Sequence, residues 1–254
     1  GEALLKMLYG GICGSDLGSY RGANAYVSYP RIPGHELAAE IVEIDDNDRG
    51  LKPGMIVTCN PYYNCGKCYS CQRGLVNCCE HNETLGPYFN CGTCYSCRRG
   101  LVNACTDNQT MGVQREGAFS EYFTMPVERI YDGQGIPPKE LALIEPFCIS
   151  YHGVSRANVK PGDKVLVFGA GAIGILAAVA ARSFGAKAYI TDIAADKVEL
   201  AVREFHLDGG FINRSEEDLT RFTHEITGDD GFDVTVEAVG APSTFLNCVD
   251  AAAS

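Results

Sequence analysis

Basic residues are scarce in this chain, and their scarcity excludes several classes of partner. The sequence has 21 Lys and Arg against 32 Asp and Glu, a formal net charge of -11 at pH 7. Nucleic acids and anionic membrane surfaces are bound by clustered Lys and Arg, so the acidic excess argues against both. No uninterrupted apolar run reaches the roughly 18 residues of a membrane-spanning helix. A basic segment followed by an apolar core, typical of a signal peptide, is also not visible.

Cysteine, by contrast, is abundant and unevenly placed. Ten of the 13 cysteines lie between Cys59 and Cys105, most of them separated by two residues. This pattern is compatible with a disulfide framework or with metal ligation. Thiolates at such close spacing converge on one metal more readily than they form several disulfides, and disulfide-dependent domains are usually small. The pattern therefore favours zinc, and the reduced thiols that zinc requires predict a cytoplasmic location.

The cysteine-rich region is an internal repeat. Residues 61–86 and 87–112 align without a gap and are identical at 18 of 26 positions. Each copy contains the spacing C-x2-C-x2-C-x7-C. Cys78 has no counterpart in the second copy, where Ala104 stands, and is expected to be a bystander. The remaining cysteines outside the spacing, Cys59, Cys148 and Cys248, are expected to be core thiols.

The rest of the chain changes character near Lys164. Before it, strand-like runs occur at 37–44 and 55–59, and again at 119–125 and 129–131. After it, a strand in VLVF, a helix at 174–186, a strand at 188–193, a helix at 194–205 and a third strand at 232–240 alternate. This alternation predicts a parallel sheet with right-handed crossovers. The fold class expected is α/β plus mainly β, with the front half of a doubly wound domain following a mainly β domain.

A glycine-rich turn opens the first of those helices. Gly169, Gly171 and Gly174 form GAGAIG directly after the strand KVLVF. In a dinucleotide-binding turn these glycines permit the tight turn, the approach of the pyrophosphate and the close packing of helix on strand. The helix N-terminus, at Ala172 and Ile173, offers free N–H groups to the phosphates. The context predicts a dinucleotide-binding site.

Asp192 indicates which dinucleotide is bound. It ends the second strand, 21 positions after Gly171. A carboxylate there accepts hydrogen bonds from the ribose hydroxyls and repels a 2′-phosphate, which favours NAD over NADP. Lys197 is a candidate for the same ribose, although a solvated helix lysine explains it equally well.

Two short fragments in the first half offer ligands for a second kind of metal site. CGSD contains Cys13 and Asp16, and PGHE contains His35 and Glu36. Taken alone, the cysteine would usually be a small core residue, and the histidine would usually be a surface or core residue. Together, a thiolate, an imidazole and carboxylates suit a catalytic zinc with an open position. Asp16 is expected to hold the second ring nitrogen of His35 and so to fix its tautomer.

Glu145 is a further candidate. It stands inside the apolar segment LALIEPF, where a carboxylate is costly unless it is paired or bound to a metal. We expect it to be a zinc ligand or a partner of zinc-bound water. His152, close by in sequence, is more typical of a packing residue.

The ordered motifs CGSD, PGHE, C-x2-C-x2-C-x7-C, LIEP and GAGAIG resemble the zinc-containing medium-chain dehydrogenases. The glutamate of LIEP resembles the polyol and sugar-acid branch, which includes sorbitol-type and threonine-type enzymes. YPRIPGHE, REGAFSEYF and ALIEPFCIS are most similar to the L-galactonate or L-idonate members. The resemblance implies a GroES-like catalytic domain at 1–152, with the duplicated zinc lobe at 61–112, and an incomplete NAD-binding Rossmann domain at 153–254.

The resemblance also implies roles for residues. Cys13, His35 and Glu36 or Glu145 would hold one catalytic zinc, and Ser15 would begin the proton relay. Gly18 stands where many relatives have a histidine, so water or a ribose hydroxyl would carry the proton onward. Each lobe would hold one structural zinc by four thiolates, Cys65, Cys68, Cys71 and Cys79 in the first copy and Cys91, Cys94, Cys97 and Cys105 in the second. One native lobe beside one poorly ordered copy is the alternative.

The activity implied is hydride transfer between a secondary alcohol, in a polyol or sugar acid, and NAD. Relatives begin earlier and run further, so the resemblance predicts that this chain is a fragment. It also predicts a homodimer or homotetramer for the full-length protein. A catalytically inactive truncated paralogue and a zinc-binding interaction module are the alternatives.

Overall fold

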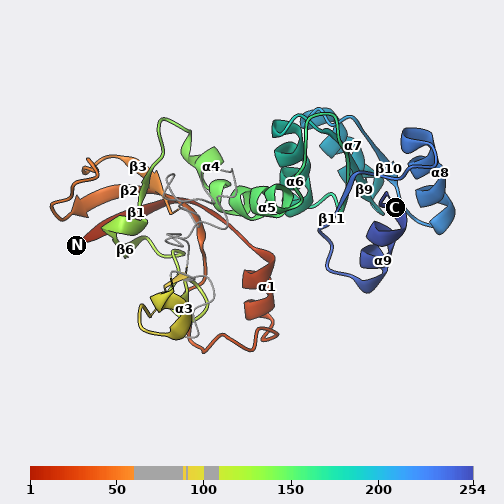
Figure 1. Cartoon of the computed structure of the whole chain (residues 1–254). Coiled ribbons are helices and arrows are strands. Elements are labelled where there is room, and N and C mark those ends of the chain that lie inside the picture. The colour runs from red at the N-terminus through yellow and green to blue at the C-terminus, as the bar shows by residue number, and fades with distance from the viewer. Residues whose placement is uncertain (60–87, 90, 100–108, 254) are drawn as a thin grey trace. The chain divides into compact units, whose positions relative to one another are not determined.

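The computed structural model describes residues 1–59, 88–89, 91–99 and 109–253 (Figure 1). Contacts divide the chain into two units, Gly1–Cys148 and Ile149–Ser254. The boundary falls inside helix α5 (Ile144–Arg156). The division into domains after residue 152 stays a prediction.

An antiparallel five-stranded sheet forms the body of the first unit. Its strand order is β6-β1-β2-β3-β7. The strands are β1 (Glu2–Gly11), β2 (Glu36–Ile44), β3 (Ile56–Thr58), β6 (Tyr122–Pro126) and β7 (Tyr131–Asp132). The register of β1 against β2 runs from Ala3 opposite Ile44 to Gly11 opposite Glu36. The end of β1 and the start of β2 therefore lie side by side.

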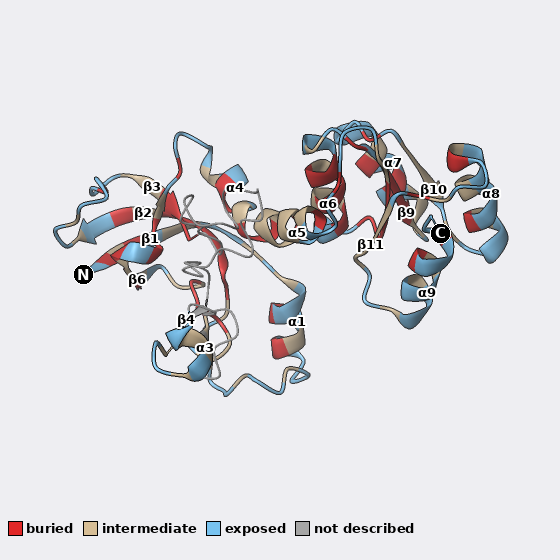
Figure 2. Ribbon diagram, viewed as in Figure 1, coloured by how far each residue is buried: buried red, intermediate tan, exposed pale blue. Residues whose placement is uncertain are grey.

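The core of this unit is built from residues of those strands and of the segments next to them. Leu5, Ile41 and Ile130 have no exposed surface, and Val57 has 1%. All four belong to one apolar cluster, which also includes Cys59 as predicted for a core thiol. Each fully buried aliphatic side chain of this size contributes about 1.5–3 kcal/mol to folding. Figure 2 shows buried stretches, in red, on strands of this sheet.

Shorter elements complete the first unit. They are α1 (Gly14–Tyr20), β4 (Tyr88–Phe89), α3 (Tyr95–Arg98), β5 (Gln109–Thr110), the 3-10 turn η3 (Val127–Arg129) and α4 (Pro138–Leu141). Strands β4 and β5 pair with each other in a separate two-stranded sheet. Helix α1 begins within the CGSD fragment, directly after Cys13, and was not predicted from the sequence.

Two predicted strands differ from the structure. The strand predicted at 129–131 is wrong: residues Val127–Arg129 form η3, and pairing resumes only at Tyr131. Pro126 precedes this turn at φ -57, and the Ile130 N–H donates to the Val127 carbonyl instead of to a neighbouring strand. The strand predicted at 119–125 begins only at Tyr122, because the Phe119 N–H donates to the Pro33 carbonyl in a loop and the Ser120 N–H donates to the Ala118 carbonyl.

A parallel sheet forms the second unit, in the order β10-β9-β8-β11. The strands are β8 (Lys164–Phe168), β9 (Lys187–Asp192), β10 (Gly209–Ile212) and β11 (Val234–Glu237). The helices are α6 (Ala172–Ser183), α7 (Ala195–Glu204), α8 (Glu216–Thr227) and α9 (Pro242–Ala251). This is the strand order of the first part of a doubly wound dinucleotide-binding domain. A parallel α/β unit after a mainly β unit is the architecture predicted.

The strand count of this unit was predicted wrongly. Residues 232–240 were expected to contain the third strand, but β10 precedes them and β11 is the fourth. The segment Gly209–Ile212 is only four residues long and begins with two glycines, so it carries a weak strand pattern. Its Phe211 stacks on Phe222 of α8 with ring centroids 4.3 Å apart, which anchors this edge of the sheet. Cys248 lies in the same core cluster, as predicted for a core thiol.

Among the helices that the structure describes, none is both long and apolar enough to cross a membrane.

Candidate functional site

Three of the predicted metal ligands come together where β1 and β2 meet. Cys13 immediately precedes α1 after the end of β1, and His35 and Glu36 stand at the start of β2. One donor atom of each residue lies within 4.8 Å of the other two. His35 and Glu36 are each 8% exposed. The antiparallel pairing of the two strands thus converts distant fragments of sequence into one cluster of donor atoms.

Asp16 joins the two fragments. Its Oδ2 accepts a hydrogen bond from the Cys13 N–H at 2.9 Å, and its Oδ1 accepts one from the Gly34 N–H at 3.4 Å. The same Oδ1 lies 3.7 Å from Nδ1 of His35. That distance is longer than a hydrogen bond, so the bond expected between Asp16 and His35 is not formed in this structure. Nδ1 of His35 is buried and has no hydrogen-bond partner within the described residues.

The electrostatics of the cluster favour a cation. A hydrogen bond with His35, together with hydrogen bonds from Ser15, lowers the pKa of the Cys13 thiol despite partial burial. Burial opposes a charge on His35, but its hydrogen bond with Cys13 and the charges of Glu145 and Asp16 raise the pKa of His35 to about 9. A thiol with a lowered pKa and several acidic side chains therefore surround one imidazole.

Glu145 lies in the first turn of α5 and is 5% exposed. Burial raises the pKa of its carboxyl to about 7, opposed by the charge of His35. Glu145 is not in the group whose donor atoms lie within 4.8 Å of one another, which contains only Cys13, His35 and Glu36. The structure thus places Glu145 in electrostatic contact with His35 and outside the closest donor set.

This donor set fits zinc. One thiolate, one imidazole and a carboxylate are ligand types that zinc takes in catalytic sites, where a further position stays open. Acidic side chains lie around a buried imidazole whose Nδ1 has no hydrogen-bond partner within the described residues, and this environment suits a divalent cation. Ser15, on the first turn of α1, is exposed beside this cluster.

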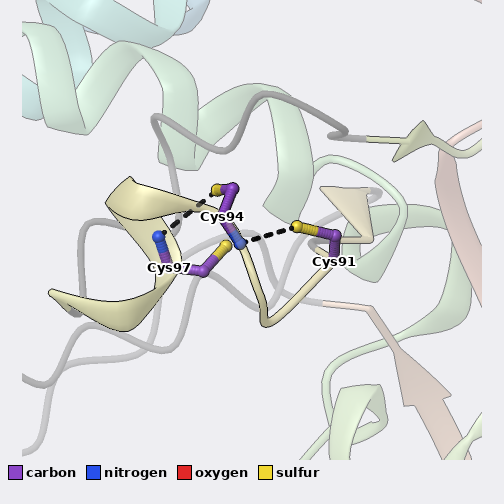
Figure 3. A group of neighbouring side chains, drawn as sticks. All are labelled: Cys91, Cys94 and Cys97. Carbon is purple, nitrogen blue, oxygen red and sulfur yellow. Dashed lines mark hydrogen bonds between the residues drawn. The ribbon is translucent and has the colours of Figure 1, made fainter.

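A second group of donors lies in the second copy of the repeat. The thiols of Cys91, Cys94 and Cys97 lie within 4.8 Å of one another (Figure 3). The Cys94 N–H donates to the Cys91 sulfur at 3.3 Å, and the Cys97 N–H donates to the Cys94 sulfur at 3.5 Å. Such N–H···S bonds stabilise thiolate charge. Helix α3 begins directly after Cys94 and carries Cys97, so the two-residue spacing becomes a convergent turn.

The other predicted thiolate ligands cannot be placed on the structure. They lie outside the described residues: Cys65, Cys68, Cys71 and Cys79 of the first copy, and Cys105 of the second. The bystander Cys78 lies there too.

The glycine-rich turn in the second unit has the geometry that a dinucleotide turn requires. Gly169 has φ +104, in the left-handed region that favours glycine, and it follows the last residue of β8. Gly171 precedes α6, whose first residues, Ala172 and Ile173, are exposed. A Cβ on Gly174 would lie 1.8 Å from the Gly169 carbonyl oxygen. The N-terminus of α6 is therefore accessible, and the turn packs too closely for a side chain at Gly174.

A pocket of about 530 Å³ lies at the carboxyl ends of the strands in this unit. Gly169, Asp192 and Lys197, all predicted cofactor residues, line it. Gly171, Ala172, Ile173 and Gly174 do not. The Asp192 carboxylate accepts hydrogen bonds from the Ala170 N–H at 2.9 Å and the Ala194 N–H at 3.0 Å. Although partial burial opposes this, these bonds and the charge of Lys197 lower the pKa of Asp192.

Several residues of this pocket were missed in the sequence. They follow β10 or β11 at the starts of the next helices: Asn213, Arg214, Ser215, Glu216, Val239, Ser243, Thr244 and Asn247. Ligands of open α/β sheets bind outside the carboxyl ends of the strands. These residues could have been predicted from their position directly after a strand. The sequence analysis did not recognise β10, so it missed the residues that follow this strand.

The chain matches two protein families in sequence. Residues 1–87 match the alcohol dehydrogenase GroES-like domain, and residues 172–254 match the zinc-binding dehydrogenase family. It is 34% identical over 249 residues to L-galactonate-5-dehydrogenase of Escherichia coli K12, covering 98% of this chain and 65% of the relative. The chain thus spans slightly less than two thirds of the length of that relative.

Solved structures of dehydrogenases are also similar to this chain. The crystal structure of galactitol-1-phosphate dehydrogenase from Escherichia coli superposes with a TM-score of 0.78 at 26% identity, over 99% of this chain and 65% of that one. The structure described as short chain alcohol dehydrogenase from Escherichia coli CFT073, complexed with cofactor NADH, has a TM-score of 0.74 at 27% identity, over 99% and 66%.

A mainly β unit with a thiolate, imidazole and carboxylate cluster, joined to a parallel α/β unit with a dinucleotide turn, defines the class of zinc-binding dehydrogenases. The chain belongs to the zinc-containing medium-chain alcohol dehydrogenase family. The family membership and the fold class predicted from the sequence motifs, GroES-like followed by Rossmann, are confirmed.

Proposed function

We propose that this protein is a zinc-dependent oxidoreductase that transfers a hydride between a secondary alcohol and NAD. The observation that carries the proposal is the convergence of Cys13, His35 and Glu36 within 4.8 Å in a chain that also contains the GAGAIG turn. The first feature is a metal-type donor set, and the second is a dinucleotide-type turn. Their combination in one chain is what a metal-assisted hydride transfer requires.

Cys13, His35 and Glu36 would hold the catalytic zinc, with Glu145 as an alternative or additional carboxylate. Zinc held there supplies a Lewis acid for the oxygen of the alcohol. Asp16 ties the segment of Cys13 to the loop before His35 by two backbone hydrogen bonds. It therefore orients the donors instead of contributing one.

Ser15 is the residue we propose for proton removal. It is exposed and hydrogen-bonded to Cys13, so its hydroxyl stands next to the donor set. Gly18, one turn along α1, carries no side chain that could continue a relay. The proton would therefore leave through water or through a ribose hydroxyl of the cofactor.

The sulfur cluster of Cys91, Cys94 and Cys97 would hold a structural zinc, with Cys105 as the fourth ligand. The first copy of the repeat offers the same spacing with Cys65, Cys68, Cys71 and Cys79. We propose one structural zinc in each copy. Four thiolates leave no open position, so neither of these sites would take part in chemistry. The thiols must be reduced to bind zinc, which supports a cytoplasmic location.

The substrate we propose is a polyol or a sugar acid. Two proteins similar to this chain are named for L-galactonate and for galactitol 1-phosphate, both of which carry several secondary hydroxyls. An open position beside Cys13 and His35 suits one such hydroxyl, and the nicotinamide cofactor supplies the hydride acceptor.

The direct test is zinc-dependent formation of NADH. The zinc-loaded chain is expected to reduce NAD with at least one of a panel of hexonates and hexitols, to lose this activity with a chelator, and to regain it when zinc is restored. Zinc content is measured on the same sample. One ion for the Cys13 site and one for each sulfur lobe are expected. One ion fewer would indicate a single filled lobe, and a chain without bound zinc, or NADH formation unaffected by the chelator, would contradict the proposal.

Asp192 is expected to select NAD over NADP. Replacing it by asparagine preserves the size of the side chain but removes the charge that would repel a 2′-phosphate. We expect the Asp192→Asn chain to bind NADPH about tenfold more tightly than the parent, or about 1.4 kcal/mol. Because the chain has no tryptophan, cofactor fluorescence on titration reads binding directly.

The matched control for this prediction is Asp208→Asn. Asp208 also accepts a backbone hydrogen bond, from the Ala188 N–H at 2.9 Å, but it does not line the pocket. Its loss should leave cofactor selectivity unchanged. If the two variants show the same selectivity as the parent, Asp192 does not set the preference.

A further inference from the structure

The loop that leads into the candidate metal ligands, residues 31–34, is covered by a second segment, residues 116–119. Glu116 contacts this loop through both carboxylate oxygens. Oε1 accepts a hydrogen bond from Nη1 of Arg31 at 2.9 Å, and Oε2 accepts one from the Ile32 N–H at 2.6 Å. The Arg31 side chain is 14% exposed and the Glu116 side chain 55%, so the ion pair is shielded from solvent only on the Arg31 side. One carboxylate thus fixes both the side chain and the backbone of the loop.

The backbone of the same segment continues the contact toward His35. The Gly117 N–H donates to the Ile32 carbonyl at 2.7 Å, the Phe119 N–H to the Pro33 carbonyl at 3.0 Å, and the Ala118 N–H to the Gly34 carbonyl at 3.0 Å. Three successive residues therefore bind three successive carbonyls. The last of these carbonyls belongs to the residue that precedes His35.

The two segments pack closely against each other. A Cβ on Gly34, which has φ +100, would lie 2.4 Å from the ring of Phe119. A Cβ on Gly117 would lie 2.2 Å from the Pro33 carbonyl oxygen. Side chains are therefore excluded at Gly34 and Gly117, and residues 116–119 lie in direct contact with the loop.

The loop is also held from the opposite direction. The Gly34 N–H donates to Oδ1 of Asp16 at 3.4 Å, and Asp16 is bonded to the Cys13 N–H. Gly34 is therefore fixed through its carbonyl by residues 116–119 and through its N–H by the Cys13 fragment. Both contacts therefore restrict the backbone position of the next residue, His35.

We propose that Glu116 is a positioning residue for the metal site: by anchoring the start of the 31–34 loop, it sets the place of the His35 imidazole relative to Cys13. This inference rests on the proposed function, because it assumes that Cys13 and His35 bind a metal. Glu116 does not belong to the donor group of Cys13, His35 and Glu36, so we do not propose it as a ligand. Its effect is exerted on the geometry of ligands, which governs metal affinity.

The test measures metal binding and leaves activity aside. The full chain is loaded with 113Cd, whose NMR signals separate sites made only of sulfur from a site with one sulfur and nitrogen or oxygen donors. Zinc affinity at the mixed site is then measured by competition with a chelator. Glu116→Ala is expected to shift the mixed-site signal and to weaken zinc binding there by about tenfold, the lower end of the range for residues that orient ligands. The sulfur-site signals should not change.

Two further variants make the result decisive. Glu121→Ala removes an exposed carboxylate from the same stretch of chain and should leave all signals and affinities unchanged. Glu116→Gln keeps one acceptor for the Ile32 N–H but presents an amide N–H2 group to Arg31. It should weaken zinc binding by a smaller factor than alanine, and it decides the question if Glu116→Ala does not fold.

The outcomes separate the two proposals. A parent chain that shows no mixed-site signal contradicts the proposed function. A parent chain that shows it, with the signal and the zinc affinity unaltered in both Glu116 variants, overturns only the role of Glu116. A lower thermal midpoint with an unchanged signal would mean that Glu116 is merely structural, which also overturns the inference.

Discussion

Replacing Gly174 by alanine is expected to destabilise the second unit by about 3 kcal/mol or more, the upper range for an overpacked core. The added Cβ would lie 1.8 Å from the Gly169 carbonyl oxygen and 3.0 Å from its carbon. Neither atom can retreat easily. The Gly169 N–H is bonded to the Thr191 carbonyl at 2.7 Å, and the next N–H, of Ala170, is bonded to Asp192.

The clash would therefore push α6 away from β8. Urea unfolding followed by far-UV circular dichroism measures the loss, since no tryptophan is present for fluorescence. Gly171→Ala is the matched control: an added Cβ there meets nothing within 4 Å, and its φ of -85 is open to any residue. Its unfolding midpoint should match that of the parent. Equal midpoints for the two variants would show that the close packing of the turn does not limit stability.

Replacing Cys13 by alanine is expected to empty the proposed catalytic zinc site and to lower NADH formation by about a thousandfold. Loss of a Lewis acid removes several kcal/mol of transition-state stabilisation, and each factor of ten in rate corresponds to about 1.4 kcal/mol. Cys13 provides the one thiolate of the Cys13, His35 and Glu36 group. Without it, the remaining imidazole and carboxylate would hold zinc far less tightly.

The measurements are zinc content and initial rate with NAD and the best substrate of the panel. Cys59→Ala is the control. Cys59 is a thiol of the same unit, 4% exposed in the apolar core, where burial raises its pKa to about 12. Its loss should cost some stability but no zinc. If Cys13→Ala retains the zinc content and rate of the parent, the metal assignment in the first unit is wrong.

Local patterns in the sequence were sufficient to predict a tight glycine-rich turn between β8 and α6. Gly169, Gly171 and Gly174 are close in sequence, and the geometry they form depends on the strand and helix on either side. Strand β10 could not be found in the same way. With two glycines among four residues, it is held by the stacking of Phe211 on Phe222 and by its pairing with β9, which are tertiary contacts.

The candidate metal site shows the same limit. The sequence indicates which residue types are present at positions 13, 35, 36 and 145. Whether they meet depends on the register of β1 on β2, which places Gly11 opposite Glu36. The sequence cannot predict interatomic distances to a few tenths of an ångström. The separation of 3.7 Å between Asp16 and His35, and the position of Glu145 outside the closest donor group, follow from packing of the whole unit.

The pairing of β4 with β5 bears on how the chain came to contain its cysteine-rich repeat twice. Tyr88 lies opposite Thr110, so the two ends of the second copy, residues 87–112, stand next to each other. A segment that leaves and returns at the same place can be copied in tandem without stretching the sheet that carries it. Doubling the length of such a loop costs only about 0.6 kcal/mol in closure entropy. A second copy inserted between such paired ends would therefore add little to the closure entropy of the segment.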